Sequence, residues 1–300
     1  MPTGRADRGA ASGAQAPDSA EFSAVHARFL AFGDGGVGEP DQYAVARTMQ
    51  ALCRREGCDF GLGLGDNIYP VGVQGVTDPQ FRTAFEVPYA PIGAPIYMAL
   101  GNHDYIGNPD AEVAYSRVSP SQRWIMPKRF YTFFAGGIRF LALDTNQPND
   151  QQEAWARKVL AESERHKEPW VIAFGHHPQQ SYGAHQMPDE PLAGFLDRVL
   201  CGHVDVYFAG HDHDKQVLRP RCGVHQVVSG AAGQLRPVGS GPETLFARSS
   251  LGFAYAEVTG PEMKLHMIDI NGKDEFQMRI VRPTKPKAQE PPAAATPAAP

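Results

Sequence analysis

The sequence predicts a layered α/β domain in which two sheets pack against each other in the middle. Two observations lead to this fold class. Short apolar runs alternate with helix-like segments between residues 28 and 213, and the segment 223–282 has strand patterns with no helix between them. Alternating strands and helices indicate a sheet covered by helices, and a strand-rich end indicates added antiparallel strands.

Each expected element has a local reason. The first helix, at residues 43–57, places Ala44, Val45, Met49 and Leu52 on one face and ends in a glycine. The other expected helices lie at residues 151–164 and 191–201. The expected strands are short apolar runs bounded by polar residues or glycine. They lie at residues 28–34, 60–66, 95–104, 139–145, 169–177 and 204–213, followed by consecutive antiparallel strands at 223–231, 253–260, 264–270 and 276–282.

The bulk composition indicates one globular domain. Of the 300 residues, 42% are hydrophobic and 20% are charged, which is typical of a chain with a sizeable core. We expect a monomeric domain at residues 25–282, with disordered segments at 1–24 and at the Pro/Ala-rich 283–300. The net charge of −5 argues against a nucleic-acid partner, and no apolar run approaches the roughly 18 residues of a membrane span.

The expected compartment of the protein bears on whether its cysteines form disulfides. The first 24 residues lack the apolar stretch of a signal peptide, so the default expectation is a cytoplasmic protein, or a secreted or periplasmic one if the true start lies upstream. Cys53, Cys58, Cys201 and Cys222 are too few for a disulfide scaffold, and their spacing matches no zinc ribbon. We expect partly buried free thiols, with a Cys201–Cys222 bridge only in an oxidising compartment.

Side chains able to bind metals follow five of the predicted strands. The groups are GD at 33–34, GDNIY at 65–69, GNHD at 101–104, GHH at 175–177 and GHDH at 210–213. Ligands gather at the carboxyl ends of strands in sheets of this kind, so these groups are expected to meet. The glycine in each group lets the backbone turn sharply and bring the side chains together.

Taken singly, each group has an ordinary explanation. An aspartate or asparagine after a strand is a common turn residue, and a lone histidine is most often a surface or core side chain. Five such groups at five strand ends favour a shared site instead. The donors are too many for one tetrahedral zinc and suit two ions bridged by one carboxylate. These donors are Asp34, Asp66, Tyr69, Asn102, His176, His211 and His213.

In this order the groups resemble the calcineurin-like metallophosphoesterases, whose blocks run GD, GD, GNH[DE], GH and GHxH. Most members carry a histidine two residues after the first aspartate, where this chain has Gly36. Loss of that histidine, together with a tyrosine three residues after the second aspartate, here Tyr69, resembles the purple acid phosphatases. The stretches GVQGVTDPQFRTAFE, GNPDAEVAYS, RWIMPKRFYTF, VVSGAAG and LGFAYAEV resemble the small, tartrate-resistant type, so the likeness extends over about residues 27–282.

The resemblance implies a four-layer α/β/β/α sandwich with two mixed central sheets and a centre of two metal ions. The ferric site would consist of Asp34, Asp66, Tyr69 and His213. The second site, for divalent iron, zinc or manganese, would consist of Asp66, Asn102, His176 and His211, with Asp66 as the bridge. A trivalent cation stabilises a phenolate, and a hard anionic oxygen in turn prefers ferric iron over softer ions.

The resemblance also implies hydrolysis of phosphate monoesters by in-line attack of a metal-bound hydroxide. His103 would protonate the leaving oxygen or hold the phosphate, and His185 would be a second histidine on the substrate side. His177 is expected beside the ligands rather than among them. Asp104 is expected either to orient His103 by a hydrogen bond or to be a plain turn aspartate.

Two other functions remain open from the sequence. A phosphodiesterase or nucleotide-processing enzyme would use the same centre on a different phosphorylated substrate. A non-catalytic relative that binds proteins should have lost ligands, and all seven are present. The expected partner is therefore a small phosphorylated substrate.

Overall fold

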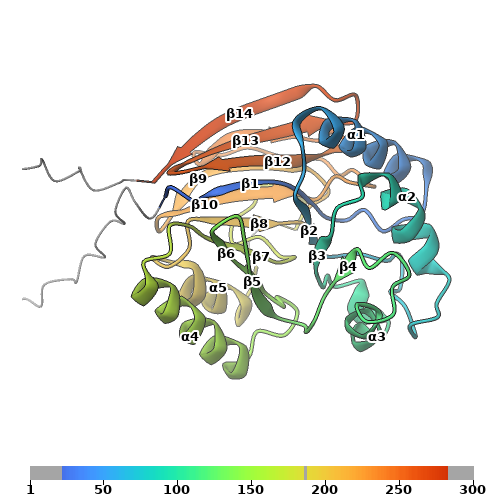
Figure 1. The fold of residues 1–300 in the computed structure, drawn as a ribbon, viewed down its shortest axis with the longest axis horizontal. Helices are drawn as coiled ribbons and strands as arrows, with labels where there is room; N and C mark the ends of the chain where they lie inside the picture. Colours follow the sequence, from blue (N-terminus) through green and yellow to red (C-terminus); the bar gives the residue numbers. More distant parts are fainter. Residues whose placement is uncertain (1–21, 186–187, 283–300) are drawn as a thin grey trace, which may run out of the picture.

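The computed structural model describes residues 22–185 and 188–282. The predicted disordered segments, 1–24 and 283–300, lie outside this part of the chain except for residues 22–24. Within it, two sheets of seven strands each pack face to face between layers of helices (Figure 1). The predicted four-layer α/β/β/α sandwich with two mixed sheets is thus confirmed.

The first sheet combines a parallel half with an antiparallel half and has the order β14-β13-β12-β1-β2-β3-β4. The parallel strands are β1 (His26–Phe32), β2 (Phe60–Leu64), β3 (Ile96–Ala99) and β4 (Trp124–Ile125). The antiparallel strands are β12 (Gly252–Thr259), β13 (Glu262–Asp269) and β14 (Asp274–Val281). The strand β12 also pairs with β1, so strands from the beginning and the end of the described chain are neighbours in this sheet.

The second sheet is also mixed and has the order β11-β9-β10-β8-β7-β6-β5. Its parallel strands are β6 (Ile138–Ala142), β7 (Val171–Phe174), β8 (Val206–Ala209) and β10 (Val224–Ser229). Its antiparallel strands are β5 (Tyr131–Ala135), β9 (Lys215–Arg221) and β11 (Thr244–Arg248). The strands expected after residue 223 are therefore divided between the two sheets: β12–β14 are consecutive and antiparallel as predicted, whereas β10 also lies parallel to β8.

Aromatic side chains fill the space between the sheets. The ring of Phe29 on β1 lies 5.5 Å from that of Phe140 on β6 and 5.7 Å from that of Phe208 on β8, edge to face in both cases. All three side chains are buried. Because side chains alternate along a strand, the neighbours Leu141 and Tyr207 point to the opposite face, where the helices pack.

The helices cover the outer faces of the sheets (Figure 1). The helices α4 (Asp150–His166) and α5 (Leu192–Leu200) pack on the second sheet, and α1 (Pro40–Glu56) covers the first. The prediction missed several short elements: a π-helical turn at Arg82–Glu86, α2 (Val87–Tyr89), α3 (Pro109–Tyr115), and 3-10 turns at Ala90–Ile92 and Asp104–Ile106. No helix in the described part of the chain has the length and apolar character needed to cross a membrane.

The packed part of the chain starts before residue 25, because the Phe22 side chain is buried in the core. The expectation of free thiols was wrong. The cysteines form two disulfides, Cys53–Cys58 and Cys201–Cys222. The end of α1 and the start of β2 bring the first pair together, and the end of α5 and the β9–β10 turn bring the second. The first bridge is local, since its cysteines are five residues apart, whereas the second joins cysteines 21 residues apart and depends on the packing of α5 against the β9–β10 turn.

Candidate metal centre

The seven predicted ligands follow β1, β2, β3, β7 and β8, at the carboxyl ends of parallel strands from both sheets. Backbone hydrogen bonds hold these loops together. The N–H of Asp34 donates to the carbonyl of Gly65 (3.1 Å), and the N–H of Gly210 donates to that of His176 (2.9 Å). The sandwich thus brings loops of both sheets to one place.

The first group of side chains surrounds the Tyr69 hydroxyl. Its oxygen lies 2.7 Å from Asp66 Oδ2, 3.2 Å from Asp34 Oδ1 and 3.2 Å from His213 Nε2. His213 Nε2 lies 3.5 Å from Asp34 Oδ1. The carboxylates and His213 are buried and close enough to share one ion. All four predicted members of the ferric site therefore face a common point.

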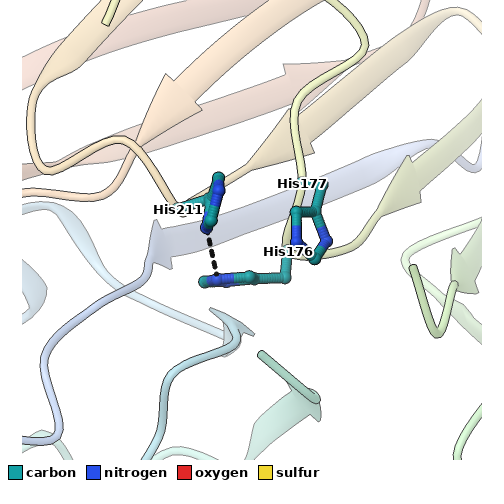
Figure 2. A group of neighbouring side chains, drawn as sticks. All are labelled: His176, His177 and His211. Carbon is teal, nitrogen blue, oxygen red and sulfur yellow. Dashed lines mark hydrogen bonds between the residues drawn. The ribbon is translucent and has the colours of Figure 1, made fainter. Parts of the chain in front are cut away.

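The second group surrounds His176. Its Nε2 lies 3.0 Å from Asn102 Oδ1 and 3.1 Å from His211 Nδ1, and Figure 2 shows the two imidazoles meeting nitrogen to nitrogen. His176 Nδ1 donates to the carbonyl of Leu64 (2.9 Å), which leaves the lone pair of Nε2 directed at the group. Asp66 Oδ1 lies 3.5 Å from the same Nε2. Asp66 therefore touches both groups, in the position of a bridge.

Three predicted ligands have strained backbone. The φ angles of Asp34, Asp66 and His211 are 59°, 51° and 68°, in the left-handed region that residues with a side chain rarely adopt. Backbone hydrogen bonds hold two of these turns in place: His211 N–H donates to Asp34 Oδ2 (2.9 Å), and His103 N–H donates to Asp66 Oδ1 (2.8 Å). Strain of this kind is concentrated at functional sites.

The first group carries an excess of acidic groups. Burial, and then the neighbouring Asp66, raise the pKa of Asp34 well above its usual value. Burial alone would also raise the pKa of Asp66. The charge of His176, and the hydrogen bonds that the Asp66 carboxylate accepts, lower this pKa instead. Burial and the charges of both carboxylates raise the pKa of Tyr69. Neither carboxylate pairs with a lysine or arginine in the described residues. A bound cation would balance this charge, so the donor set fits metal ions.

The imidazoles are kept in the form that binds metals. Burial lowers the pKa of His176, and also that of His211, whose neighbouring histidines lower it further. The pKa of His213 falls to about 4, through burial and then the charge of Arg236. Each ring is therefore neutral at neutral pH and offers a lone pair.

His103 lies against the first group, with its ring centroid 4.4 Å from that of Tyr69. Its Nδ1 donates to the carbonyl of Pro70 (2.8 Å), so Nε2 is the ring nitrogen available for proton transfer. Of the two alternatives expected for Asp104, a hydrogen bond that orients His103 is not the one found. Asp104 instead accepts hydrogen bonds from Gly101 N–H (2.7 Å) and from Asn67 N–H and Nδ2. It fixes the loop after β2, which carries the predicted ligands Asp66 and Tyr69.

His185 lies over the second group, with its ring centroid 4.1 Å from that of His211. Asp212 Oδ1 accepts from the His185 backbone N–H (2.9 Å) and lies 3.1 Å from its Nδ1. A Cβ on Gly183 would lie 2.3 Å from the Asp212 carboxyl carbon, so this close approach requires glycine. Sequence reasoning missed the role of Asp212, although its place between two predicted ligands in GHDH was a signal.

His177 lies beside the second group, as Figure 2 shows. Its ring centroid is 4.4 Å from that of His211, and its Nδ1 is 2.8 Å from Thr145 Oγ1. Burial, and then His176, lower the pKa of His177 to about 3. His177 is close enough to His176 and His211 to share an ion with them, so its exclusion from the ligands stays a prediction.

Gly36 explains the missing histidine of the first block. A Cβ at this position would lie 1.9 Å from the carbonyl oxygen of Asn67, so a side chain does not fit against this backbone. The Gly36 carbonyl accepts from the N–H of Tyr69 (2.9 Å). The residue that leaves no room for a histidine therefore also holds the tyrosine in place.

Comparisons with known proteins agree with this geometry. The family model "Calcineurin-like phosphoesterase" matches residues 27–215. Tartrate-resistant acid phosphatase type 5 of Homo sapiens is 32% identical over 320 residues, which cover 90% of this chain and 95% of the relative. Purple acid phosphatase 7 of Arabidopsis thaliana is 28% identical, with 81% and 83% covered. The solved structure of GAP50, described as the anchor in the inner membrane complex of Plasmodium, has a TM-score of 0.74 at 21% identity and covers 87% of this chain and 90% of that one.

The chain belongs to the calcineurin-like phosphoesterase family and is a phosphoric ester hydrolase. Within the family, its relatives over most of its length are the tartrate-resistant and purple acid phosphatases, as the motifs predicted. Family membership implies a centre of two metals, and the two groups of ligands are suited to hold them. The likeness to GAP50 shows the fold alone.

Proposed function

We propose that this chain is a phosphomonoesterase with one ferric and one divalent ion, the latter iron, zinc or manganese. The ferric ion would bind Asp34, Asp66, Tyr69 and His213, and the divalent ion would bind Asp66, Asn102, His176 and His211. The observation that carries this proposal is the Tyr69 hydroxyl, which lies within 3.2 Å of two carboxylates and of His213.

The surroundings of Tyr69 support a trivalent cation. Burial and two neighbouring carboxylates raise the pKa of Tyr69, so without a cation the phenol stays protonated. A strongly charged cation reverses this preference, because it stabilises the phenolate more than the carboxylates destabilise it. A site with three hard oxygen donors and one imidazole suits ferric iron better than softer ions.

The chain's own residues would position and protonate the substrate. When bound, two neighbouring cations hold phosphate oxygens and activate a water for in-line attack. His103 is suited to protonate the leaving oxygen through Nε2, because Pro70 holds the proton of Nδ1. His185, fixed by Asp212 and lying over His211, would line the substrate side of the second site.

The visible spectrum of the purified protein tests the metal assignment. A phenolate bound to ferric iron absorbs visible light, so the wild type should be violet, and Tyr69→Phe should be colourless. Turnover should fall less in Tyr69→Phe than in Asp66→Asn, because the bridging carboxylate remains. Tyr255→Phe is the matched control, since its hydroxyl donates to the carbonyl of Gly57, the residue that follows α1, away from the predicted ligands. A colourless wild type containing two zinc ions would refute the ferric assignment.

The same preparation separates the alternative functions. Faster hydrolysis of a phosphodiester than of a phosphomonoester would favour a diesterase or nucleotide-processing enzyme. The net charge of −5 gives no support for binding long nucleic acids. Full metal occupancy without turnover would favour a protein-binding role. An anchor with this fold exists in Plasmodium, so the fold by itself does not imply catalysis.

We also propose that the protein is a monomer that folds in an oxidising compartment. The two disulfides support the second statement, because thiols stay reduced in the cytosol of most cells. Free-thiol titration of protein isolated from its native source tests it. Four free thiols would refute the oxidising compartment, and no free thiol would support it.

A further inference from the structure

Arg236 lies at the edge of the candidate metal centre, in the segment that follows β10. This segment is fixed by its backbone. The N–H of Gly230 donates to the Asp214 carbonyl (3.0 Å), that of Ala232 to the Gly33 carbonyl (3.3 Å), and that of Arg236 to the His213 carbonyl (2.8 Å). The Arg236 backbone is therefore tied directly to a residue of the ferric site, while its side chain is exposed.

The guanidinium of Arg236 reaches the substrate side of the centre. Its Nη1 lies 3.1 Å from His185 Nε2. The His185 ring in turn lies 4.1 Å from that of His211, centroid to centroid. Only one imidazole thus separates the guanidinium from the second group of ligands.

A hydrogen-bonded chain sets the direction of this contact. Asp212 accepts the proton of His185 Nδ1, so the lone pair of Nε2 faces Arg236 and accepts one of its N–H groups. The hydroxyl of Ser181 donates to the other oxygen of Asp212, which is buried. The buried Asp212 therefore positions His185, and His185 in turn positions the guanidinium of Arg236.

The guanidinium of Arg236 has no carboxylate partner in the described part of the chain, and most of its N–H donors are available to a ligand. Among residues 22–185 and 188–282, it forms no ion pair, whereas Arg139, Arg198 and Arg221 each pair with a carboxylate. A guanidinium carries five N–H donors in a planar fork that matches phosphate, and the hydrogen bond to His185 uses one of them. An unpaired arginine next to a centre that binds phosphate is thus suited to bind an anion.

We propose that Arg236 binds a second anionic group of the substrate, adjacent to the phosphate held by the metal centre. This inference rests on the proposed function. Because one imidazole separates the guanidinium from the second group, the two anionic groups of the substrate would be neighbours, which favours condensed phosphates such as inorganic pyrophosphate or a nucleoside diphosphate. Hydrolysis forms a bond from the water oxygen to the terminal phosphorus and breaks the bridging P–O bond. One water proton passes to the leaving phosphate.

Steady-state kinetics of the metal-loaded enzyme test this proposal. The substrates are inorganic pyrophosphate and p-nitrophenyl phosphate, and the aryl phosphate has no second anionic group. In Arg236→Gln, the KM for pyrophosphate should rise about tenfold more than the KM for the aryl phosphate, as expected for loss of a charge-assisted contact. Arg236→Lys should restore part of the difference because it keeps the charge without the fork. The control is Arg219→Gln, since Arg219 is an exposed arginine of β9 whose backbone N–H donates to the Glu243 carbonyl.

Calorimetric binding of inorganic phosphate and pyrophosphate gives a readout independent of turnover. The wild type should bind pyrophosphate more tightly than phosphate, and Arg236→Gln should bind the two alike. An equal loss for both anions, or for both substrates, would overturn the proposal, because Arg236 would then act on the shared phosphate or only through His185. A wild type that hydrolyses neither substrate would refute the proposed function instead, and the calorimetric comparison would still decide the role of Arg236.

Discussion

The disulfide Cys201–Cys222 should contribute more to stability than Cys53–Cys58, because it closes a longer loop. The sequence separations are 21 and 5 residues. A cross-link stabilises the folded state mainly by reducing the conformational entropy of the unfolded chain, and this reduction grows with the logarithm of the loop length. The relation gives roughly 3 kcal/mol for the longer loop and roughly 2 kcal/mol for the shorter one at 25 °C.

The position of the longer bridge links its stability to the candidate metal centre. Gln179, just beyond His176 and His177, has its Nε2 3.6 Å from Cys201 Sγ. The same amide donates to Asp197 Oδ1 of α5 (2.8 Å), and its oxygen accepts from Gln226 of β10 (2.7 Å). The bridge therefore lies behind the loop that carries His176. Its loss should loosen this loop as well as lower the free energy of unfolding.

Urea unfolding of two double variants provides the assay. We expect Cys201→Ala with Cys222→Ala to lower the free energy of unfolding by about 3 kcal/mol, and Cys53→Ala with Cys58→Ala to lower it by about 2 kcal/mol. The variant lacking all four cysteines is the control, since a reducing agent should not change its transition. If removing the longer bridge costs no more than removing the shorter one, the loop-entropy reasoning is refuted.

Two further substitutions have defined outcomes. His103→Ala should lower kcat about a hundredfold with the metal content unchanged, because alanine keeps the N–H that Asp66 accepts; loss of metal on elemental analysis would contradict this role. Arg139→Met should lower the free energy of unfolding by about 3 kcal/mol, because it breaks an ion pair with Glu168 whose side chains are 10% and 9% exposed. Burial alone would raise the pKa of Glu168, but Arg139 lowers it below its usual 4.5. The pair therefore stabilises above pH 4.5 and is lost as the pH falls further, so the deficit of the variant should shrink in acid; a deficit constant from pH 7 to pH 3 would contradict the argument.

The fold was predictable where local patterns determine it. The helix α1 follows from the periodicity of its apolar face, and β1, β2, β7 and β8 follow from short apolar runs; each was predicted to within a few residues. The strand β9 was missed because its sequence, KQVLRPR, has charged residues and a proline where an apolar run was sought. The division of the last strands between two sheets depends on contacts such as that of β12 with β1, which no local pattern encodes.

The candidate site was predictable to the extent that strand ends define it. Seven side chains after five strands meet because parallel strands of both sheets end at the same edge. Residues that act through contacts across the chain were not found this way. Asp104 was singled out, but not its contact with Asn67, 37 residues away, and the contact of Arg236 with His185, 51 residues away, was not predicted at all. The short sequence motifs contain no information on these distances.

The packing of two loops also accounts for the choice of tyrosine over histidine in this chain. Asn67 is held by its N–H to Asp104 and by its amide to Ala99, so the loop after β2 has little freedom to move away from Gly36. A histidine at position 36 would need the space of the Asn67 carbonyl. Displacing that carbonyl would shift Asp66 on one side and Tyr69 on the other, because both are close neighbours of Asn67 in the chain. The backbone therefore accepts Gly36 with Tyr69 and excludes a histidine at position 36. The contact between these two loops therefore explains why position 36 contributes no side chain to the first group.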